Sequence, residues 1–105
     1  MDPELRSEFK KAWAKLIVVE GKKDKRALER LGCKKILTLE NKPLYAVVES
    51  LLPEKEVVLL TDLDKKGKEL YARLYRSCTK RGVRVDNTLR LLLFRERVSH
   101  IEGLH

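Results

Sequence analysis

The stretch VVLLTDLDKKG, residues 57–67, joins an aliphatic run to a pair of aspartates and then to a lysine-rich turn around a glycine. The aliphatic run is rich in β-branched residues, as expected of a strand that is covered on both faces of a parallel sheet. Asp62 and Asp64 follow at once, and alternate side chains of an extended segment point the same way. The stretch therefore predicts two carboxylates side by side where a buried strand ends.

The rest of the chain alternates strand-like runs with segments of helical periodicity. The predicted strands span residues 16–20, 35–39, 57–61 and 97–102. The predicted helices span about residues 2–15, 24–32, 43–53, 64–82 and 88–94. Such alternation in 105 residues implies right-handed crossovers between parallel strands. We expect an α/β fold, a three-layer α/β/α sandwich with a mostly parallel sheet of about four strands, built as a single domain over residues 1–105.

The composition favours a polyanionic partner, since the formal net charge is +8 and the isoelectric point is near 9.7. Charged residues make up 38% of the chain, however, and an ion-paired surface typical of a thermophile explains the lysines equally well. Cys33 and Cys78 have no zinc-ligand spacing and are expected to be free thiols. With no membrane span and no signal peptide in the sequence, we expect a cytoplasmic protein that does not bind membranes.

The acidic residues point to a metal site. Ligands of parallel sheets bind outside the carboxyl ends of the strands, where Glu20 ends the first strand and Asp62 the third. If these strands are neighbours, Glu20, Asp62 and Asp64 converge, and their repulsion calls for a compensating cation. Hard oxygen ligands suit Mg²⁺ or Mn²⁺. His100 and Glu102 fall near the same edge and are weaker candidates for a ligand or a proton shuttle.

Lysines and glycines occupy the two loops beside these acids. Gly21 and Gly67 would let the loops turn sharply or approach a ligand closely. Candidates for phosphate binding are Lys22, Lys23, Lys25, Lys65, Lys66 and Lys68. A solvated lysine-rich loop is an equally good interpretation of these residues. Trp13, Tyr71 and Tyr75 lie on apolar stripes and are expected to pack in the core.

Two motifs in this order, LIVVEGKKD from Leu16 and LLTDLDKKG from Leu59, resemble the Toprim domain. That family is a metal-binding phosphotransfer module of bacterial primases, topoisomerases, recombination-repair proteins and ribosomal-RNA maturation nucleases. Its signature is a glutamate followed by glycine after the first strand and D-x-D after the third. The resemblance implies a Rossmann-like sheet with magnesium bound there.

The resemblance also assigns roles. It makes Glu20 the general base or acid and a further metal ligand, and Asp62 and Asp64 the magnesium ligands. Gly21 and Gly67 match the glycines that shape the two loops. Asp24 matches a secondary acid at the start of the following helix.

Two positions depart from the family pattern, because Leu63 stands where many members have proline and Lys68 where many have an acid. The extra domains of primases and topoisomerases do not fit in 105 residues, so the chain is most similar to small stand-alone Toprim proteins. A protein partner would then supply part of the substrate-binding surface.

The resemblance implies a magnesium-dependent phosphoryl-transfer enzyme acting on RNA or DNA, either a nuclease or a primase-like nucleotidyl transferase, in RNA processing or in DNA repair and replication. The alternative is a non-catalytic, metal-assisted nucleic-acid-binding module of a larger assembly. A phosphate-accepting signalling domain is a third, weaker interpretation. Receiver domains pair their acids after the first strand, whereas this chain pairs them after the third.

Overall fold

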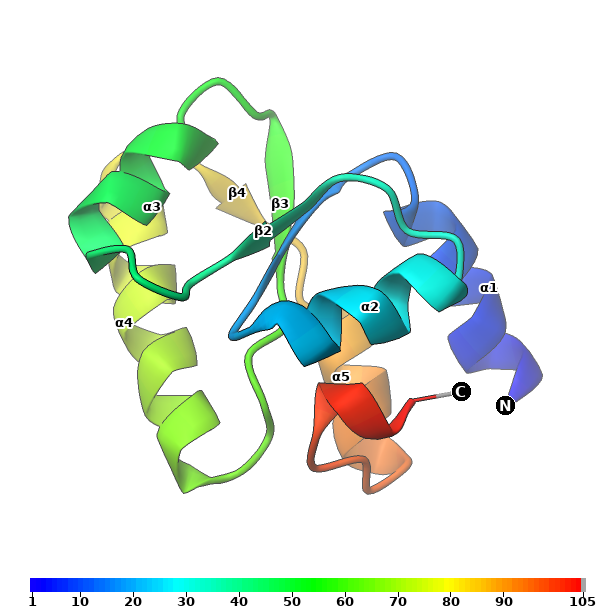
Figure 1. Cartoon of the computed structure of the whole chain (residues 1–105). Coiled ribbons are helices and arrows are strands. Elements are labelled where there is room, and N and C mark those ends of the chain that lie inside the picture. Colours follow the sequence, from blue (N-terminus) through cyan, green and yellow to red (C-terminus); the bar gives the residue numbers. More distant parts are fainter. Residues whose placement is uncertain (105) are drawn as a thin grey trace.

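Four parallel strands form the centre of the computed structural model, which describes residues 1–104 (Figure 1). The strands are β1 (Leu16–Val19), β2 (Ile36–Thr38), β3 (Glu56–Leu59) and β4 (Arg84–Val85). Their order in the sheet is β2-β1-β3-β4, and every pair is parallel. Val18 of β1 lies opposite Leu37 on one side and Leu59 on the other. The predicted α/β fold with a parallel, four-stranded sheet is confirmed, and β1 and β3 are its central strands.

Helices cover both faces of the sheet (Figure 1). The helices are α1 (Pro3–Ala12), α2 (Lys22–Arg30), α3 (Leu44–Leu51), α4 (Lys65–Lys80) and α5 (Thr88–Arg95), followed by a 3₁₀ turn, η1 (Ile101–Gly103). Apolar side chains from α1, α2, α5 and η1 share one core cluster with one face of the sheet. Side chains from α3 and α4 share a second cluster with the other face. The result is a three-layer sandwich with two separate cores.

The helix ends follow signals in the sequence. Asp2 caps α1, because its carboxylate accepts a hydrogen bond of 3.0 Å from the Leu5 amide, and Pro3 opens the helix with a preset φ. Gly32 and Gly82 follow α2 and α4 with φ of 95° and 78°, a left-handed conformation that glycine adopts at little cost.

The predicted strand at residues 97–102 is wrong. After α5 the chain turns at Arg97, whose φ is 58°, and Val98, Ile101 and Leu104 pack into the core of α1, α2 and α5. These three residues repeat every third position, the period of a 3₁₀ turn and not of a strand. The fourth strand is instead the two-residue β4, which pairs with Glu56 and Val57 and is too short to show an alternating pattern.

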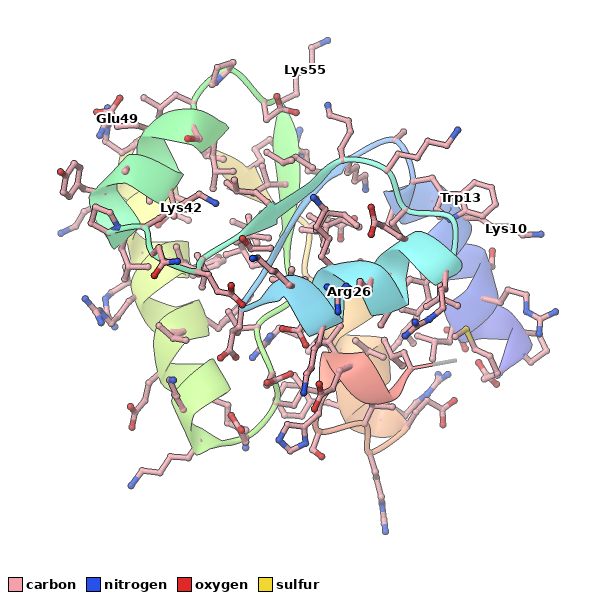
Figure 2. The ribbon with its side chains drawn as sticks, in the orientation of Figure 1. Lys10, Trp13, Arg26, Lys42, Glu49 and Lys55 are labelled. Carbon is pink, nitrogen blue, oxygen red and sulfur yellow. The ribbon has the colours of Figure 1, made fainter. Side chains whose placement is uncertain are left out.

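Two aromatic side chains that were expected in the core are exposed. Trp13 is 42% exposed and lies just past the C-terminal end of α1 (Figure 2), where its indole N–H donates to the Leu31 carbonyl at 2.8 Å. Tyr75 is 40% exposed, and its ring stacks on that of Tyr71 at 5.8 Å. Tyr71 is partly buried against the core cluster of α3 and α4. Helical spacing alone therefore overestimated the width of the buried stripes.

Both cysteines are buried and free. Burial raises the pKa of the Cys33 thiol to about 11 and also raises that of Cys78, so neither is a thiolate nucleophile at neutral pH. Among the helices of residues 1–104, none combines the length and apolarity required to cross a bilayer.

Candidate metal and phosphoryl-transfer site

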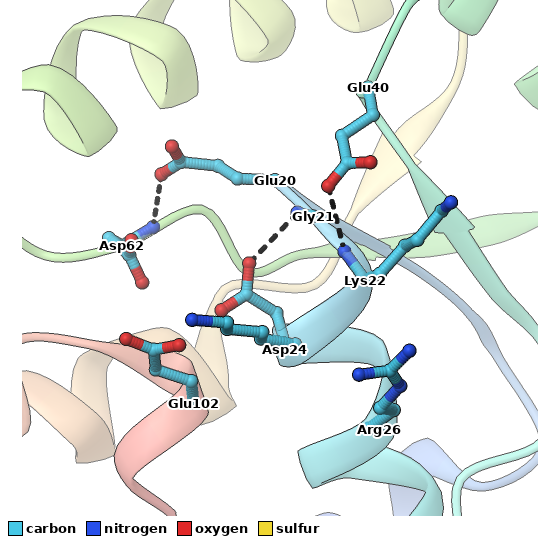
Figure 3. Close-up of a pocket in the computed structure, with 9 residues that line it drawn as sticks. Glu20, Gly21, Lys22, Asp24, Arg26, Glu40, Asp62 and Glu102 are labelled. Carbon is cyan, nitrogen blue, oxygen red and sulfur yellow. Dashed lines mark hydrogen bonds between the residues drawn. The ribbon is translucent and has the colours of Figure 1, made fainter.

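The central pair of strands brings the acids of the two sequence motifs together. Because β1 and β3 are parallel neighbours, Glu20 and Asp62 leave the sheet at the same edge. The Glu20 carboxylate accepts a hydrogen bond of 2.8 Å from the backbone amide of Asp62 through its Oε2 atom (Figure 3). This bond ties the first motif to the second across 42 residues of sequence.

The segment that carries Asp62 and Asp64 is fixed against the start of α4. Asp64 is the N-cap of α4, and its Oδ1 accepts a hydrogen bond of 2.8 Å from the Gly67 amide. The Thr61 hydroxyl donates to the Gly67 carbonyl at 2.6 Å. A Cβ atom at Gly67 would lie 1.9 Å from the carbonyl oxygen of Asp62, so the backbone of α4 and the backbone of Asp62 approach each other more closely than any residue except glycine allows. Leu63 is buried, as expected for the residue between the two aspartates.

The segment around His100 lies along this loop on its other side. The Leu63 amide donates to the Ser99 carbonyl at 2.7 Å, and the Ile101 amide donates to Asp62 Oδ1 at 2.9 Å. His100 Nε2 lies 3.4 Å from Asp64 Oδ2, and its Nδ1 is 3.0 Å from the Ser99 hydroxyl. The chain after α5 therefore places an imidazole beside the two aspartates.

Asp62, Asp64 and His100 form a candidate metal site. One ligand atom from each lies within 4.8 Å of the others. Two ligands at about 2.2 Å from one cation are at most about 4.4 Å apart, so this spacing is close to what a single ion bridges. The two carboxylates suit a hard divalent cation such as Mg²⁺ or Mn²⁺, whereas the imidazole is a ligand more typical of Zn²⁺ and other first-row transition ions than of Mg²⁺. Glu20 is not one of these three residues, and its carboxylate is bonded to the backbone of Asp62 and not to its side chain.

A buried arginine lies beneath the same loop. Arg90 of α5 is 3% exposed, and its guanidinium donates to the carbonyls of Thr61 at 2.6 Å and Asp62 at 3.2 Å. The Tyr71 ring lies 4.3 Å from the guanidinium carbon. Burial lowers the pKa of Arg90, and the charges of nearby groups including Glu20 and Asp62 oppose that shift. Arg90 is therefore a fixed positive charge that holds the backbone before Asp64.

Glu20 lies between two hollows of the surface. One, of about 530 Å³, is lined by Asp24 and Asp62 and by basic side chains of α2, including Lys22 and Arg26 (Figure 3). The other, of about 450 Å³, lies towards α4 and contains Lys42 and Lys66. Glu20 and Glu40 line both. The two hollows thus share these carboxylates, and each also contains basic side chains; we call them together the acidic groove.

The comparisons with known proteins agree with this geometry. The Toprim domain profile matches residues 14–88, which include both acidic motifs. The chain belongs to the Toprim family. Toprim membership and the Asp62, Asp64 and His100 cluster together indicate a metal-dependent function related to nucleic acid.

Relatives of this Toprim chain occur in archaea and in a bacterium. A UPF0292 protein of Methanocaldococcus jannaschii is 35% identical over 76% of this chain and 65% of its own length. A UPF0292 protein of Pyrococcus abyssi is 37% identical over 84% of this chain and 67% of its own length. The chain thus spans about two thirds of these relatives. A solved structure, described as a putative protein from Aquifex aeolicus, is 34% identical and superposes with a TM-score of 0.89 over 96% of this chain and 95% of that one.

Asp24 lines the same hollow as Glu20 and Asp62, although it belongs to a helix and not to a strand end. Helix α2 begins at Lys22 with Gly21 as its N-cap, two residues before the predicted start at residue 24. Asp24 lies in the first turn, 7% exposed, and accepts a hydrogen bond of 2.9 Å from the Gly21 amide. Burial raises the pKa of Asp24, the Gly21 amide opposes this, and the charges of Asp62, Glu20 and Glu102 raise it further.

Some of the lysines in the two loops beside the acids line the hollows around Glu20, and others do not. Lys22 and Lys23 line the hollow beside Asp24, and Lys66 lines the other. Lys65 is exposed and lines neither of these hollows, while Lys68 places its ammonium 5.3 Å from the Phe94 ring. The predicted contact of the loop lysines with phosphate stays a prediction.

Sequence reasoning did not predict two residues that lie around the candidate metal site and the acidic groove. Arg90 and Glu40 were not predicted, and Glu40 accepts a hydrogen bond of 3.0 Å from the Lys22 amide at the start of α2. A single arginine inside the apolar run TLRLLLF is a signal that could have pointed to a buried, paired cation. His100 and Glu102 do lie at the site edge, although on a turn and not on a strand.

Proposed function

We propose that this protein is a metal-dependent nuclease that hydrolyses a phosphodiester of RNA or DNA at the edge where β1 and β3 end. One observation supports this most: the Glu20 carboxylate is fixed by the amide of Asp62, a member of the Asp62, Asp64 and His100 cluster, and lines two hollows that contain lysine and arginine side chains. We further propose Mg²⁺ or Mn²⁺ as the ion, with Asp62 and Asp64 as ligands and Glu20 as a catalytic residue.

The residues divide the chemistry between them. The bound cation would neutralise charge on the scissile phosphate and position the attacking water. Oε2 of Glu20 is occupied by the Asp62 amide, which leaves Oε1 to accept a proton from that water. The water oxygen bonds to phosphorus, the bond to the leaving nucleotide oxygen breaks, and that oxygen takes a proton from solvent. Lys22, Lys23 and Lys66 would hold the flanking phosphates.

The test is cleavage of end-labelled structured RNA and single-stranded DNA with Mg²⁺ or Mn²⁺. The informative variants are Glu20→Gln and Asp62→Asn, because each keeps an oxygen that can accept the hydrogen bond now made by the carboxylate. Glu49→Gln is the matched control, since Glu49 is exposed on α3 away from the groove (Figure 2).

We expect cleavage by the wild type and by Glu49→Gln, and a loss of at least a hundredfold in the two site variants. Metal-dependent binding without cleavage, equal in the wild type and Glu20→Gln, would reject the nuclease. That result would assign the protein as a metal-assisted binding module whose catalytic surface comes from a partner.

A further inference from the structure

A third hollow, of about 410 Å³, lies between α1 and the end of α2, away from the acidic groove. Its lining combines the aromatic ring of Trp13 with three cationic side chains, those of Arg6, Lys10 and Arg30. No acidic residue lines it. Neither the Toprim motifs nor the proposed chemistry uses any of these side chains.

The indole of Trp13 is held firmly although it is 42% exposed. Its Nε1 donates to the Leu31 carbonyl at 2.8 Å, and a Cβ atom at Gly32 would lie only 2.7 Å from its six-membered ring. The ring therefore packs on a backbone that has no side chain at that point. An exposed aromatic ring that is already immobile loses little conformational freedom when a planar ligand stacks on it.

The three cations around Trp13 have no ionic partner among residues 1–104. Arg6, Lys10 and Arg30 are all exposed, and none of them forms an ion pair there. By contrast, Arg95 at the end of α5 forms ion pairs with Asp2 and Glu4 at the start of α1. Uncompensated cations around an aromatic ring suit a ligand that carries both phosphates and planar bases.

Helix α2 connects this hollow to the acidic groove. Lys22, Arg26 and Arg30 are spaced four residues apart, so they form one stripe along the helix. Lys22 and Arg26 line the groove beside Asp62, whereas Arg30 lines the hollow beside Trp13. The stripe is about 12 Å long, at about 1.5 Å per residue. Figure 2 shows Arg26 on the outer side of α2 and Trp13 beside the far end of that helix.

We propose that the α2 stripe and Trp13 form a track for single-stranded nucleic acid that leads away from the metal site. The phosphates lie along Lys22, Arg26 and Arg30, and one unpaired base stacks on the indole of Trp13. The inference rests on the proposed function for the identity of the groove, and it adds that the substrate is unpaired on this side of the scissile bond. A base within a duplex is already stacked and cannot reach the ring.

Trp13 reports on this contact directly, because it is the only tryptophan of the chain. Oligouridylate and oligothymidylate of about ten nucleotides would be titrated in EDTA and low salt, so that the metal site takes no part. We expect quenching of the Trp13 fluorescence on binding. In anisotropy titrations of labelled oligonucleotide, we expect Trp13→Ala to bind about tenfold more weakly, and Trp13→Phe to retain most of the affinity.

Arg30→Gln and Arg76→Gln distinguish a direct contact with the oligonucleotide from the general attraction of a positively charged protein. Each removes one positive charge, and Arg76 is an exposed residue of α4, on the other face of the sheet. We expect about fivefold weaker binding for Arg30→Gln and less than twofold for Arg76→Gln.

Binding without quenching, with equal affinity of the wild type and Trp13→Ala, would overturn the track. So would an equal effect of the two arginine variants. If the wild type quenches on binding but cleaves nothing, the track is supported and only the nuclease is rejected. If the wild type cleaves but its Trp13 fluorescence and the affinity of Trp13→Ala are unchanged, the nuclease is supported and the track is rejected.

Discussion

Replacing Gly67 by alanine should both destabilise the protein and weaken cation binding at the candidate metal site. Gly67 lies in the first turn of α4, where alanine would ordinarily stabilise a helix by about 1 kcal/mol. Here the added Cβ would meet the Asp62 carbonyl oxygen at 1.9 Å, whereas real contacts of this kind stay above 3.0 Å. The backbone of Asp62 must therefore withdraw by about 1.1 Å, the difference between these two distances.

The magnitude follows from the contacts that this movement breaks. Crowding of this kind costs about 1–3 kcal/mol. Separation of the Thr61 hydroxyl from the Gly67 carbonyl, now 2.6 Å apart, costs about 1 kcal/mol more. After the gain in helix propensity, the free energy of unfolding should fall by roughly 1–3 kcal/mol. Because Asp62 moves, affinity for Mn²⁺ should fall by about tenfold or more.

Urea denaturation in EDTA measures the first effect, and calorimetric titration with Mn²⁺ the second. Gly103→Ala is the control, since a Cβ at Gly103 meets no atom within 4 Å, and its stability should change by less than about 0.5 kcal/mol. A Gly67→Ala protein that is as stable as the wild type, with unchanged Mn²⁺ affinity, would refute the close contact between α4 and Asp62.

Three further predictions test other parts of the molecule. The double variant Asp62→Asn and Asp64→Asn should lose Mn²⁺ binding in calorimetry while its stability in EDTA stays equal or rises, because the amide oxygens keep the hydrogen bonds and the repulsion is gone; retained Mn²⁺ binding would place the ion elsewhere. Arg90→Met should lower the free energy of unfolding by about 2 kcal/mol, because two backbone carbonyls lose their donor, and a stability equal to wild type in urea would contradict this. Burial alone would raise the pKa of Asp86, but hydrogen bonds from Lys15, at 2.6 Å, and from Thr88 lower that pKa overall. The ionised Asp86 carboxylate therefore stabilises the folded protein above about pH 4, and this stabilisation is lost as the pH falls through the lowered pKa. The cost of Asp86→Asn in urea should be about 1 kcal/mol at pH 7 and smaller at pH 3, and an equal cost at both would be inconsistent with this ion pair.

The central strands and their helices could be predicted because their sequence signals are local. LIVV and EVVL are aliphatic runs, and the neighbouring helices carry caps such as Asp2 and terminal glycines such as Gly32. The two-residue β4 gives no such signal, because its pairing with β3 depends on where α4 ends and not on its own side chains. The prediction of a strand after α5 was wrong because the segment is short and apolar. Its buried residues, Val98, Ile101 and Leu104, follow one another at every third position, which indicates a 3₁₀ turn and not the alternation of a strand.

The acidic site was predictable only as far as the sheet fixes it. Glu20 and Asp62 meet because their strands are neighbours, a condition that the spacing of the residues left open and the structure supplies. Arg90 comes from the last quarter of the chain and reaches the loop through tertiary contacts with Thr61 and Asp62 that no spacing encodes. His100 was expected near this edge, but on a strand, whereas it approaches Asp64 from a turn. The exposure of Trp13 is of the same kind, because it depends on the packing of the indole against Gly32.

Arg90 has a consequence for how the protein responds to metal supply. Its charge is part of the chain, so the carbonyls of Thr61 and Asp62 keep their hydrogen-bond donor whether or not a cation is present. Proteins that depend on their metal for folding lose their structure when the ion is withdrawn, and must fold again before they work. This chain should instead keep its shape through many cycles of loading and release. Occupancy of the candidate metal site would then follow the free concentration of the ion on the timescale of binding, so that the proposed metal-dependent function would respond to metal supply without a folding delay.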